Sequence, residues 1–443
     1  MSVRRFEFKD SRSYKFWEIT VEGCSYTVRY GKVGTAGVTQ TKAFATPEKA
    51  AADANKKLNA KVGKGYSEVG SVAVATPKSA DPEADWTVRA DGLQAAGDPW
   101  GQRIALSIAR DAAKGADKRK WTKELDQLSA DNREHFFGAE LAALMDQDGF
   151  DKVARLTWQY GYIVKARVGM PEYGFDGPQA RAVLRAIVGS PAAAYLRDLT
   201  IGLYDFEGGG LSGVGSDIAS GLELAELERL FIGDFNSEEQ EISWVDFGDI
   251  SPIYPRTPKL RTLRLQGAGI VLGELEHPTL ARLEIETGGL PQSSVASLAA
   301  AKLPELVHME AWFGRTEYGG TTDIAALRPI FTSQTLPKLK HLGLQNSEMQ
   351  DAIASELANS PLLAQVESVD LSMGTMREPG AQAILTNAAA FKHLKSLNLA
   401  NNYIPHELTS QLRTALGRAV QTSGQQSADV YDGESYYYTT VGE

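Results

Sequence analysis

Residues 394–402 read Leu-Lys-Ser-Leu-Asn-Leu-Ala-Asn-Asn, and the pattern Leu-x-x-Leu-x-Leu at their start recurs through the second half of the chain. Eight segments fit this pattern when other apolar residues are allowed at its three positions. Their central residues are Leu199, Leu230, Leu263, Leu283, Met309, Leu342, Val369 and Leu397. The first and last lie 198 residues apart over seven intervals, a mean period of about 28 residues. Repetition at this period predicts stacked units, each with one strand and a return segment.

The period is in the range of leucine-rich repeats with a helix on the outer side. Helical return segments are indicated at 323–331, 349–358 and 380–390, and Asn402 can satisfy backbone groups where the last strand turns into a loop. A single repeat cannot bury its own apolar face. We therefore expect residues 195–422 to stack as an α/β solenoid, a horseshoe whose strands line the concave side.

The residues on either side of each central apolar position point away from the core, so they form two rows on the concave side. Arg and aromatic residues, which are enriched at binding hot spots, occur in these rows and at the adjacent Trp312. We interpret this surface as the site for a protein partner. The candidate residues are Arg229, Phe231, Arg264, Arg282, Glu284, His308, Glu310, Trp312, His341 and Asp370. The alternative is a solvated face that binds nothing.

His308 and His341 occupy equivalent positions one repeat apart. Such a pair could sense pH or bind a metal ion, but two imidazoles are too few to define a metal site. No metal site is predicted.

Length and composition limit the class of protein. A chain of 443 residues with 43% hydrophobic and 23% charged residues is typical of a soluble protein of two to four domains. Its apolar runs are too short to span a membrane, and Ser2-Val3-Arg4-Arg5 does not begin a secretion signal. The one cysteine, Cys24, excludes an intrachain disulfide. We expect a cytoplasmic protein.

The net charge of −10 is unevenly distributed. Residues 1–70 hold 13 Lys and Arg against 7 Asp and Glu, a charge of +6, whereas the remainder holds 33 against 49, a charge of −16. A small basic module is thus joined to an acidic body. This division is compatible with phosphate binding at one end, and equally with docking of the module on an acidic neighbour.

The basic module reads as a small sheet followed by a helix. Alternating β-prone residues predict strands at 5–8, 15–20, 25–30 and 38–44, and Thr46-Pro47 begins a helix that ends near Val62. We place a domain at 1–70. Small residues with two prolines follow, which predict a linker at 71–84.

Residues 4–69 resemble a WGR domain, a small module of DNA-damage-activated poly(ADP-ribose) polymerases and of many bacterial proteins. The resemblance lies in Phe16-Trp17-Glu18-Ile19, Thr27-Val28-Arg29, Tyr30-Gly31-Lys32-Val33-Gly34, Thr39-Gln40-Thr41-Lys42 and Lys64-Gly65-Tyr66. In the polymerases a Trp and an Arg of this signature contact DNA near a strand break; Tyr30 and Lys32 stand there in this chain. Lysine keeps the positive charge but lacks the two-pronged contact of arginine with phosphate. In the basic module we interpret Arg29, Lys32 and Lys42 as cations that bind phosphate and Tyr30 as a ring that packs on sugar or base. The predicted nucleic-acid-binding residues are Arg29, Tyr30, Gly31, Lys32 and Lys42. The alternative is that Tyr30 only packs in the domain and the lysines are solvated.

A third region, residues 85–194, is predicted to be mainly helical. Asp98-Pro99 begins one helix, and residues 156–168 read as a pair of strands or as one strand bent at Gly161. Asp91-Gly92-Leu93 and the residues up to Gln102 resemble a companion domain that precedes leucine-rich repeats in bacterial proteins. The tail, 423–443, contains Asp432-Gly433 between β-prone residues, which predicts a turn and a terminal strand that caps the solenoid or docks elsewhere.

The sequence carries no recognisable catalytic motif. It lacks H-E-x-x-H, G-x-S-x-G and the kinase signatures, and no catalytic residue or cofactor is predicted. The whole architecture, WGR domain, companion domain and repeats, resembles a group of bacterial proteins. We expect a non-catalytic adaptor that binds nucleic acid, DNA or RNA, through the WGR domain and a protein through the repeats. The alternative is a protein scaffold in which the WGR domain docks on protein.

Overall fold

The computed structural model describes residues 4–9, 14–22, 24–32, 38–62, 67–68, 82–206, 210–332 and 335–442. The chain divides into two compact units, Met1–Val88 and Arg89–Glu443. In the described part of the chain, the helices are all too short or too polar to cross a membrane.

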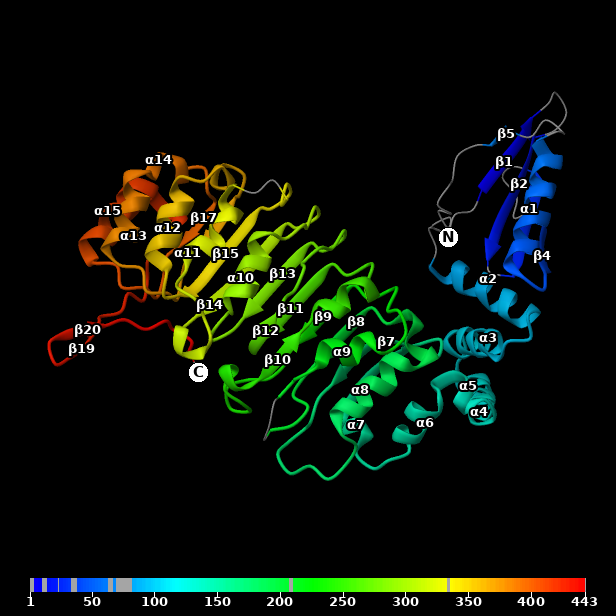
Figure 1. The fold of residues 1–443 in the computed structure, drawn as a ribbon. Helices are drawn as coiled ribbons and strands as arrows, with labels where there is room; N and C mark the ends of the chain where they lie inside the picture. Colours follow the sequence, from blue (N-terminus) through cyan, green and yellow to red (C-terminus); the bar gives the residue numbers. More distant parts are fainter. Residues whose placement is uncertain are drawn as a thin grey trace. The chain divides into compact units, whose positions relative to one another are not determined.

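The first unit is a five-stranded antiparallel sheet with one helix (Figure 1). Its strands are β1 (Arg4–Lys9), β2 (Tyr14–Glu22), β3 (Ser25–Lys32), β4 (Val38–Ala43) and β5 (Ser67–Glu68), in the spatial order β4-β3-β2-β1-β5. Helix α1 (Pro47–Val62) begins after Thr46, whose hydroxyl accepts the amide of Lys49 at 3.4 Å. The four predicted strands and the predicted helix are confirmed.

Alternation along the strands builds the core of this unit. Inward residues of β1, β2 and β3 pack with two residues of α1, and Tyr30 and Phe44 lie partly buried against them. The core residues are Phe6, Trp17, Ile19, Tyr26, Val28, Ala54 and Leu58. One face of the sheet is therefore covered by α1.

The second unit is built on an eleven-stranded mixed sheet with the order β18-β17-β16-β15-β14-β13-β11-β9-β8-β7-β6. Its strands are β6 (Ala154–Gln159), β7 (Tyr162–Val168), β8 (Asp198–Ile201), β9 (Arg229–Ile232), β11 (Thr262–Gln266), β13 (Arg282–Glu286), β14 (His308–Gly314), β15 (His341–Ser347), β16 (Ser368–Asp370), β17 (Ser396–Asn398) and β18 (Val420–Gln421). β6 and β7 are antiparallel, and from β7 onward all neighbours are parallel. The predicted succession of parallel strands is confirmed.

The register of these strands is constant, so equivalent residues of successive repeats lie side by side. One row consists of Asp198, Arg229, Thr262, Arg282, His308, His341, Ser368 and Ser396. The second row consists of Thr200, Phe231, Arg264, Glu284, Glu310, Gly343, Asp370 and Asn398. Between the rows, the central apolar residues point to the opposite side and are at most 1% exposed. We call the side that carries the two rows the open face.

The return segments cover the apolar side of the sheet (Figure 1). They contain α9 (Val214–Ala219), α10 (Gln292–Ala299), α11 (Ile324–Leu327), α12 (Gln350–Ala358), α13 (Glu378–Thr386), α14 (Ala388–Phe391) and α15 (His406–Leu416). The three predicted return helices correspond to α11, α12 and the pair α13–α14. A short parallel pair, β10 (Asp246–Asp249) and β12 (Ala268–Val271), lies outside the main sheet.

Asn402 has the role that the sequence indicates. Its side chain is fully buried, donates to the carbonyls of Leu371, Leu399 and Ala400, and accepts the amide of Met376 at 3.0 Å. One amide side chain thus satisfies the backbone of two neighbouring repeats.

The region before the repeats belongs to the same compact unit as the repeats. Helix α2 (Pro82–Ala95) crosses the boundary between the two units, which falls after Val88. The residues that follow contain α3 (Pro99–Ala112), α4 (Gly115–Asp131), α5 (Arg133–Phe137), α6 (Ala139–Met145), α7 (Phe150–Val153), the β6–β7 hairpin and α8 (Ala180–Gly189). Helix α2 begins within the predicted linker, of which 71–81 lies outside the described residues. Asp98 caps α3 as expected, with its carboxylate 2.9 Å from the amide of Trp100.

The tail forms a hairpin of β19 (Asp429–Tyr431) and β20 (Glu434–Tyr436) that is a sheet of its own. Asp432 and Gly433 have φ angles of 50° and 82°, as the predicted Asp-Gly turn requires. The last described residues then contact the end of β15 and the loop that follows β16. The amide of Thr440 donates to the carbonyl of Met373 at 2.9 Å, and that of Val441 to Oδ1 of Asn346 at 2.9 Å.

Candidate nucleic-acid interface and the open face of the large sheet

The predicted nucleic-acid residues lie on both faces of the small sheet. In the β3–β4 register, Tyr26 is opposite Lys42 and Arg29 is opposite Thr39. Directly opposed residues share a face and successive residues alternate. Tyr30 and Lys42 therefore belong to the face covered by α1, whereas Arg29 and Gly31 belong to the other face. The structure does not bring these two pairs together.

Arg29 forms a bidentate ion pair within the sheet. Its Nε and Nη2 lie 2.7 and 3.2 Å from the two carboxylate oxygens of Glu18, and the guanidinium lies 5.3 Å from the centre of the Phe16 ring. The Glu18 side chain is only 8% exposed, so its charge needs this partner. Arg29 is first of all the counterion of a buried carboxylate.

Tyr30 and Lys42 are both engaged but remain accessible in part. Tyr30 lies against the core. Lys42, with a side chain 53% exposed, places its ammonium 3.2 Å from Asp53 and 4.7 Å from the centre of the Phe44 ring. Lys32 is the last residue of β3, and its side chain lies outside the described part of the structure.

Two lysines of α1 complete a feature that the sequence analysis missed. Lys57 and Lys61 are one helical turn apart, so they lie on one side of the helix. The ammonium of Lys57 is 5.6 Å from the centre of the Tyr26 ring, and that of Lys61 is 5.7 Å from Trp17 and 5.9 Å from Tyr30. We define the lysine–aromatic face as Tyr26, Tyr30, Lys42, Phe44, Lys57 and Lys61. The i,i+4 spacing of the two lysines is the signal that could have identified them.

Asp53 organises the centre of the lysine–aromatic face. The Tyr26 hydroxyl donates to its carboxylate at 2.7 Å, and this bond, together with Lys42, holds the pKa of Asp53 below its usual value. Burial and the neighbouring carboxylate raise the pKa of Tyr26 to about 12. At neutral pH the pair is therefore a carboxylate and a neutral phenol, and Asp53 fixes the Lys42 ammonium at the edge of the sheet.

On the open face, all three candidate arginines are paired within the sheet. Arg229 lies 2.9 Å from Asp198, Arg282 pairs with Glu284, and Arg264 lies 2.8 Å from Glu286. The guanidinium of Arg264 also lies 4.4 Å from the centre of the Phe231 ring. These pairs fix the arginines in position and neutralise much of their charge.

The remaining polar candidates of the open face are also held by neighbours. The indole of Trp312 donates to Oε1 of Gln345 at 2.7 Å. Asp370 accepts from the amide of Ser372 at 2.9 Å and from the side chain of Asn398 at 2.8 Å. Both side chains are half-buried, so the face is a preorganised polar surface rather than a set of free groups.

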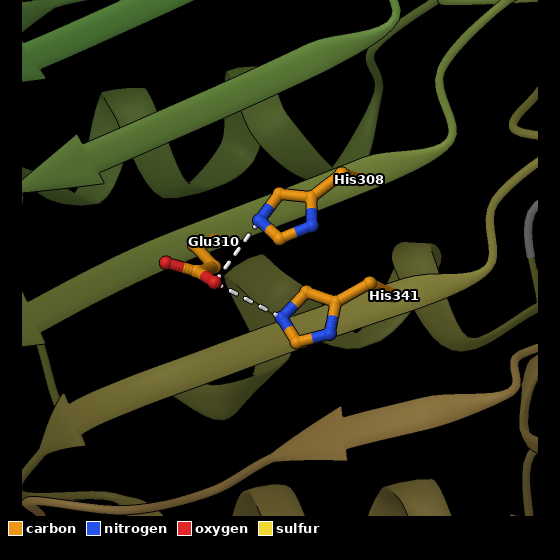
Figure 2. Close-up of side chains that lie close together, drawn as sticks. All are labelled: His308, Glu310 and His341. Carbon is orange, nitrogen blue, oxygen red and sulfur yellow. Dashed lines mark ion pairs between the residues drawn. The ribbon is translucent and has the colours of Figure 1, made fainter. Parts of the chain in front are cut away.

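His308, Glu310 and His341 form a compact cluster on the open face (Figure 2). Oε1 of Glu310 lies 3.0 Å from Nε2 of His308 and 3.1 Å from Nε2 of His341. The two imidazoles lower the pKa of the Glu310 carboxyl far below its usual range. All three residues stood among the partner-binding candidates, but the sequence analysis did not join Glu310 to the histidines.

Three comparisons with known proteins bear on the first unit. The WGR domain family matches residues 2–72. Two Escherichia coli proteins are similar over the same part of the chain: the uncharacterized protein YfeS, 48% identical over 65 residues, and the protein YehF, 38% identical over 66 residues. Each match covers 15% of this chain, with 27% of YfeS and 24% of YehF. The chain thus spans about a quarter of the length of these relatives.

A likeness to a solved structure extends over the whole chain. The crystal structure of a Bacteroides fragilis protein, a structural genomics target, is 27% identical with a TM-score of 0.49 and covers 99% of both chains. Residues 2–72 of this chain are a WGR domain.

Proposed function

We propose that the protein is a non-catalytic adaptor. Its WGR domain binds the sugar-phosphate backbone of DNA or RNA, and its open face holds a protein partner. The observation that carries the first part is the lysine–aromatic face, where Lys42, Lys57 and Lys61 each lie within 6 Å of an aromatic ring.

This combination suits nucleic acid for a physical reason. Ammonium groups neutralise phosphates and release condensed counterions, and exposed ring edges pack on sugars or bases. The +6 charge of residues 1–70 adds long-range attraction for a polyanion, while the −16 of the remainder repels it. Binding is therefore expected to be confined to this unit.

The proposed contact is a backbone contact with little sequence preference. Lysine acts on phosphate as a mobile point charge, whereas arginine makes a planar two-pronged contact. Arg29, the arginine of the predicted set, is already held by Glu18. We therefore propose that the domain recognises the charge and the backbone geometry of the nucleic acid rather than its bases.

The test is a binding series with the full-length protein. Fluorescence anisotropy is measured with labelled single-stranded DNA, nicked duplex, 5′-phosphorylated duplex and single-stranded RNA at several salt concentrations. We expect the logarithm of the binding constant to fall linearly with the logarithm of the salt concentration, with about 0.7 to 0.9 counterions released per phosphate contact. Absence of binding to all four probes at low salt would refute it and favour the protein scaffold as the alternative.

The second part of the proposal concerns the repeats. We propose that residues 195–422 are leucine-rich repeats stacked as a solenoid, and that the open face is its binding surface. The constant strand register and the burial of the central apolar residues support this. Arg264 over Phe231 and the nearby Trp312 are the residue types that dominate hot spots.

A double variant tests the open face. Arg264→Glu with Trp312→Ala is expected to abolish capture of the partner in a pull-down from native lysate. Arg413→Glu, on the exposed side of α15, is the matched control and is expected to leave capture unchanged. If the double variant and the Arg413→Glu control capture the same amount of partner, the open face is not the binding surface.

A further inference from the structure

The cluster on the open face arises from strand register. His308 and Glu310 are two residues apart on β14 and so share a face, and His341 of β15 is the register partner of His308. Adjacent strands are about 4.8 Å apart, so two imidazoles and one carboxylate meet although 33 positions separate the histidines in sequence. Nε2 of both rings and Oε1 of Glu310 are the atoms that converge (Figure 2).

Gly343 makes this convergence possible. It is the register partner of Glu310, and a Cβ atom built on it would lie 2.8 Å from Cγ of Glu310. Any side chain at position 343 would therefore push Glu310 aside. Because glycine stands there, the Glu310 side chain leans across β15 and reaches His341.

The converging atoms lie within 4.8 Å of one another, and the two nitrogen–oxygen distances are slightly shorter than those between ligands of one ion. Metal bonds of 2.0–2.2 Å to imidazole and carboxylate, at tetrahedral angles, place the ligand atoms roughly 3.3–3.6 Å apart. The two nitrogen–oxygen distances here are 3.0 and 3.1 Å. Only small movements separate this arrangement from a coordination shell.

The Nε2 atoms of both rings lack a well-aligned hydrogen bond. Nε2 of His308 and Nε2 of His341 are buried atoms, and neither is aligned for a hydrogen bond with Glu310 despite the short distances. Buried polar atoms without a hydrogen bond are rare and call for an explanation. A lone pair reserved for a metal ion is such an explanation.

The rings need one adjustment to share an ion. Their planes are 9° from parallel with centroids 4.1 Å apart, so their in-plane lone pairs run side by side. Rotation about χ2, a broad torsion for histidine, turns both toward one point. The Ser368 hydroxyl lies 2.8 Å from Nδ1 of His341 and can accept a hydrogen bond from Nδ1–H; in that tautomer Nε2 keeps its lone pair for a metal ion.

We propose that His308, Glu310 and His341 form a binding site for a divalent transition-metal ion of the Zn²⁺ type. Two imidazoles and one carboxylate are the ligands of Zn²⁺ and its neighbours in the first row, whereas Mg²⁺ and Ca²⁺ select oxygen ligands. Three protein ligands leave a fourth position for water or an external donor. The side chains are 17–29% exposed, so such a donor can reach the ion from solvent.

The experiment is isothermal titration of tag-free, metal-stripped full-length protein with ZnCl₂ and with CoCl₂. All proteins carry Cys24→Ser, because Cys24 is an exposed thiol that would also bind these ions. We expect one ion per chain with micromolar or tighter affinity, and visible absorption bands of tetrahedral Co²⁺. MgCl₂ is expected to give no binding at the same concentrations.

Three variants distinguish a coordination site from a hydrogen-bonded cluster. His308→Ala with His341→Ala is expected to weaken Zn²⁺ binding by more than about 100-fold, and Gly343→Ala by about 10-fold through displacement of Glu310. His406→Ala, an exposed histidine on α15, is the control and should bind as the parent does. Circular dichroism verifies folding of each variant. Zn²⁺ affinity unchanged in the double histidine variant, or no binding by the parent, would overturn the proposal.

Discussion

Arg29 and Lys42 project from opposite faces of the same small sheet, although the resemblance places both in one nucleic-acid site. Arg29 is bound to the buried Glu18, whereas Lys42 lies at the edge of the lysine–aromatic face beside Asp53. Two cations of the same domain thus have different roles. Arg29 is the counterion of Glu18, whereas Lys42, whose side chain is 53% exposed, is one of the cations on which the proposed phosphate contact depends.

The first prediction concerns Lys42, Lys57 and Lys61. Changing all three to Gln removes three positive charges from one face, so the affinity for a single-stranded oligonucleotide should fall about 10- to 100-fold near 0.1 M salt. The slope of log K against log salt should decrease by about 2, since each phosphate contact contributes about 0.7 on single strands. Fluorescence anisotropy across a salt series measures both quantities.

The matched control for this prediction is a second triple variant. Lys114, Lys118 and Lys123 are exposed lysines on or beside α4, in the other unit. Their change to Gln alters the net charge equally and should leave the slope as in the parent. If the two triple variants lose the same affinity, net charge rather than the lysine–aromatic face controls binding.

The second prediction assigns Arg29 to stability. Arg29→Gln leaves the Glu18 carboxylate buried without its ion pair, which should destabilise the small sheet by about 1–2 kcal/mol. Hydrogen exchange of peptides covering β2 and β3 measures this loss locally. The double variant Glu18→Gln with Arg29→Gln also removes the buried charge of Glu18 and should restore part of the protection. Unchanged exchange in Arg29→Gln would contradict the role given to this pair.

The open face could be predicted in detail because two periods fix it. The repeat of about 28 residues gives the strands, and the alternation within a strand gives the side of each residue. His308 and His341 therefore appear as row neighbours in both the sequence and the structure. The pattern does not predict that Glu310 joins the two histidines. The direction of its side chain depends on its rotamer and on the absence of a side chain at Gly343.

The small sheet shows a different limit. Arg29 and Tyr30 are adjacent in the signature, and adjacency in a strand means opposite faces, a consequence the resemblance does not reveal. The i,i+4 spacing places Lys57 and Lys61 on one side of α1, and their nearness to Tyr26, Trp17 and Tyr30 follows only once the side of α1 that packs on the strands is known. The sequence allowed either two strands or one bent strand at residues 156–168, and the structure shows the β6–β7 hairpin. The pairing of β7 with β8 is a long-range contact that no local pattern encodes.

The third prediction tests the buried row of central apolar residues. Leu342 belongs to β15, and its side chain is fully buried on the side of the sheet that the helices cover. Leu342→Ala should therefore lower the free energy of unfolding of the large unit by about 2–5 kcal/mol. Leu222 is 44% exposed, and Leu222→Ala should change the free energy of unfolding by less than about 0.5 kcal/mol. Urea unfolding followed by far-ultraviolet circular dichroism compares the two. Similar midpoints for both variants would contradict the assigned register.

The fourth prediction follows from His277, which is 2% exposed. Its Nε2 donates to the carbonyl of Thr257 at 3.0 Å, while Nδ1 accepts the amide of Thr279 at 3.4 Å, an arrangement for a neutral ring. Burial lowers the pKa of His277, more than its bond to Thr257 raises it. The folded pKa is therefore below that of the unfolded chain, which is about 6.5.

The sign of the pH effect is fixed by this difference. Below about pH 6.5 the unfolded chain binds a proton at His277 that the folded chain does not, so stability falls as pH decreases, until the lowered folded pKa is passed. One proton contributes at most about 1.4 kcal/mol per pH unit. His277→Gln should be less stable than the parent at pH 8, by about 1 kcal/mol for the lost hydrogen bonding, yet have a flatter profile from pH 7 to pH 5. Urea unfolding at each pH measures the free energy of unfolding. The control is His406→Gln at an exposed position, which is expected to follow the parent. If the pH profiles of His277→Gln and the parent are parallel, the proton uptake of His277 does not change on unfolding.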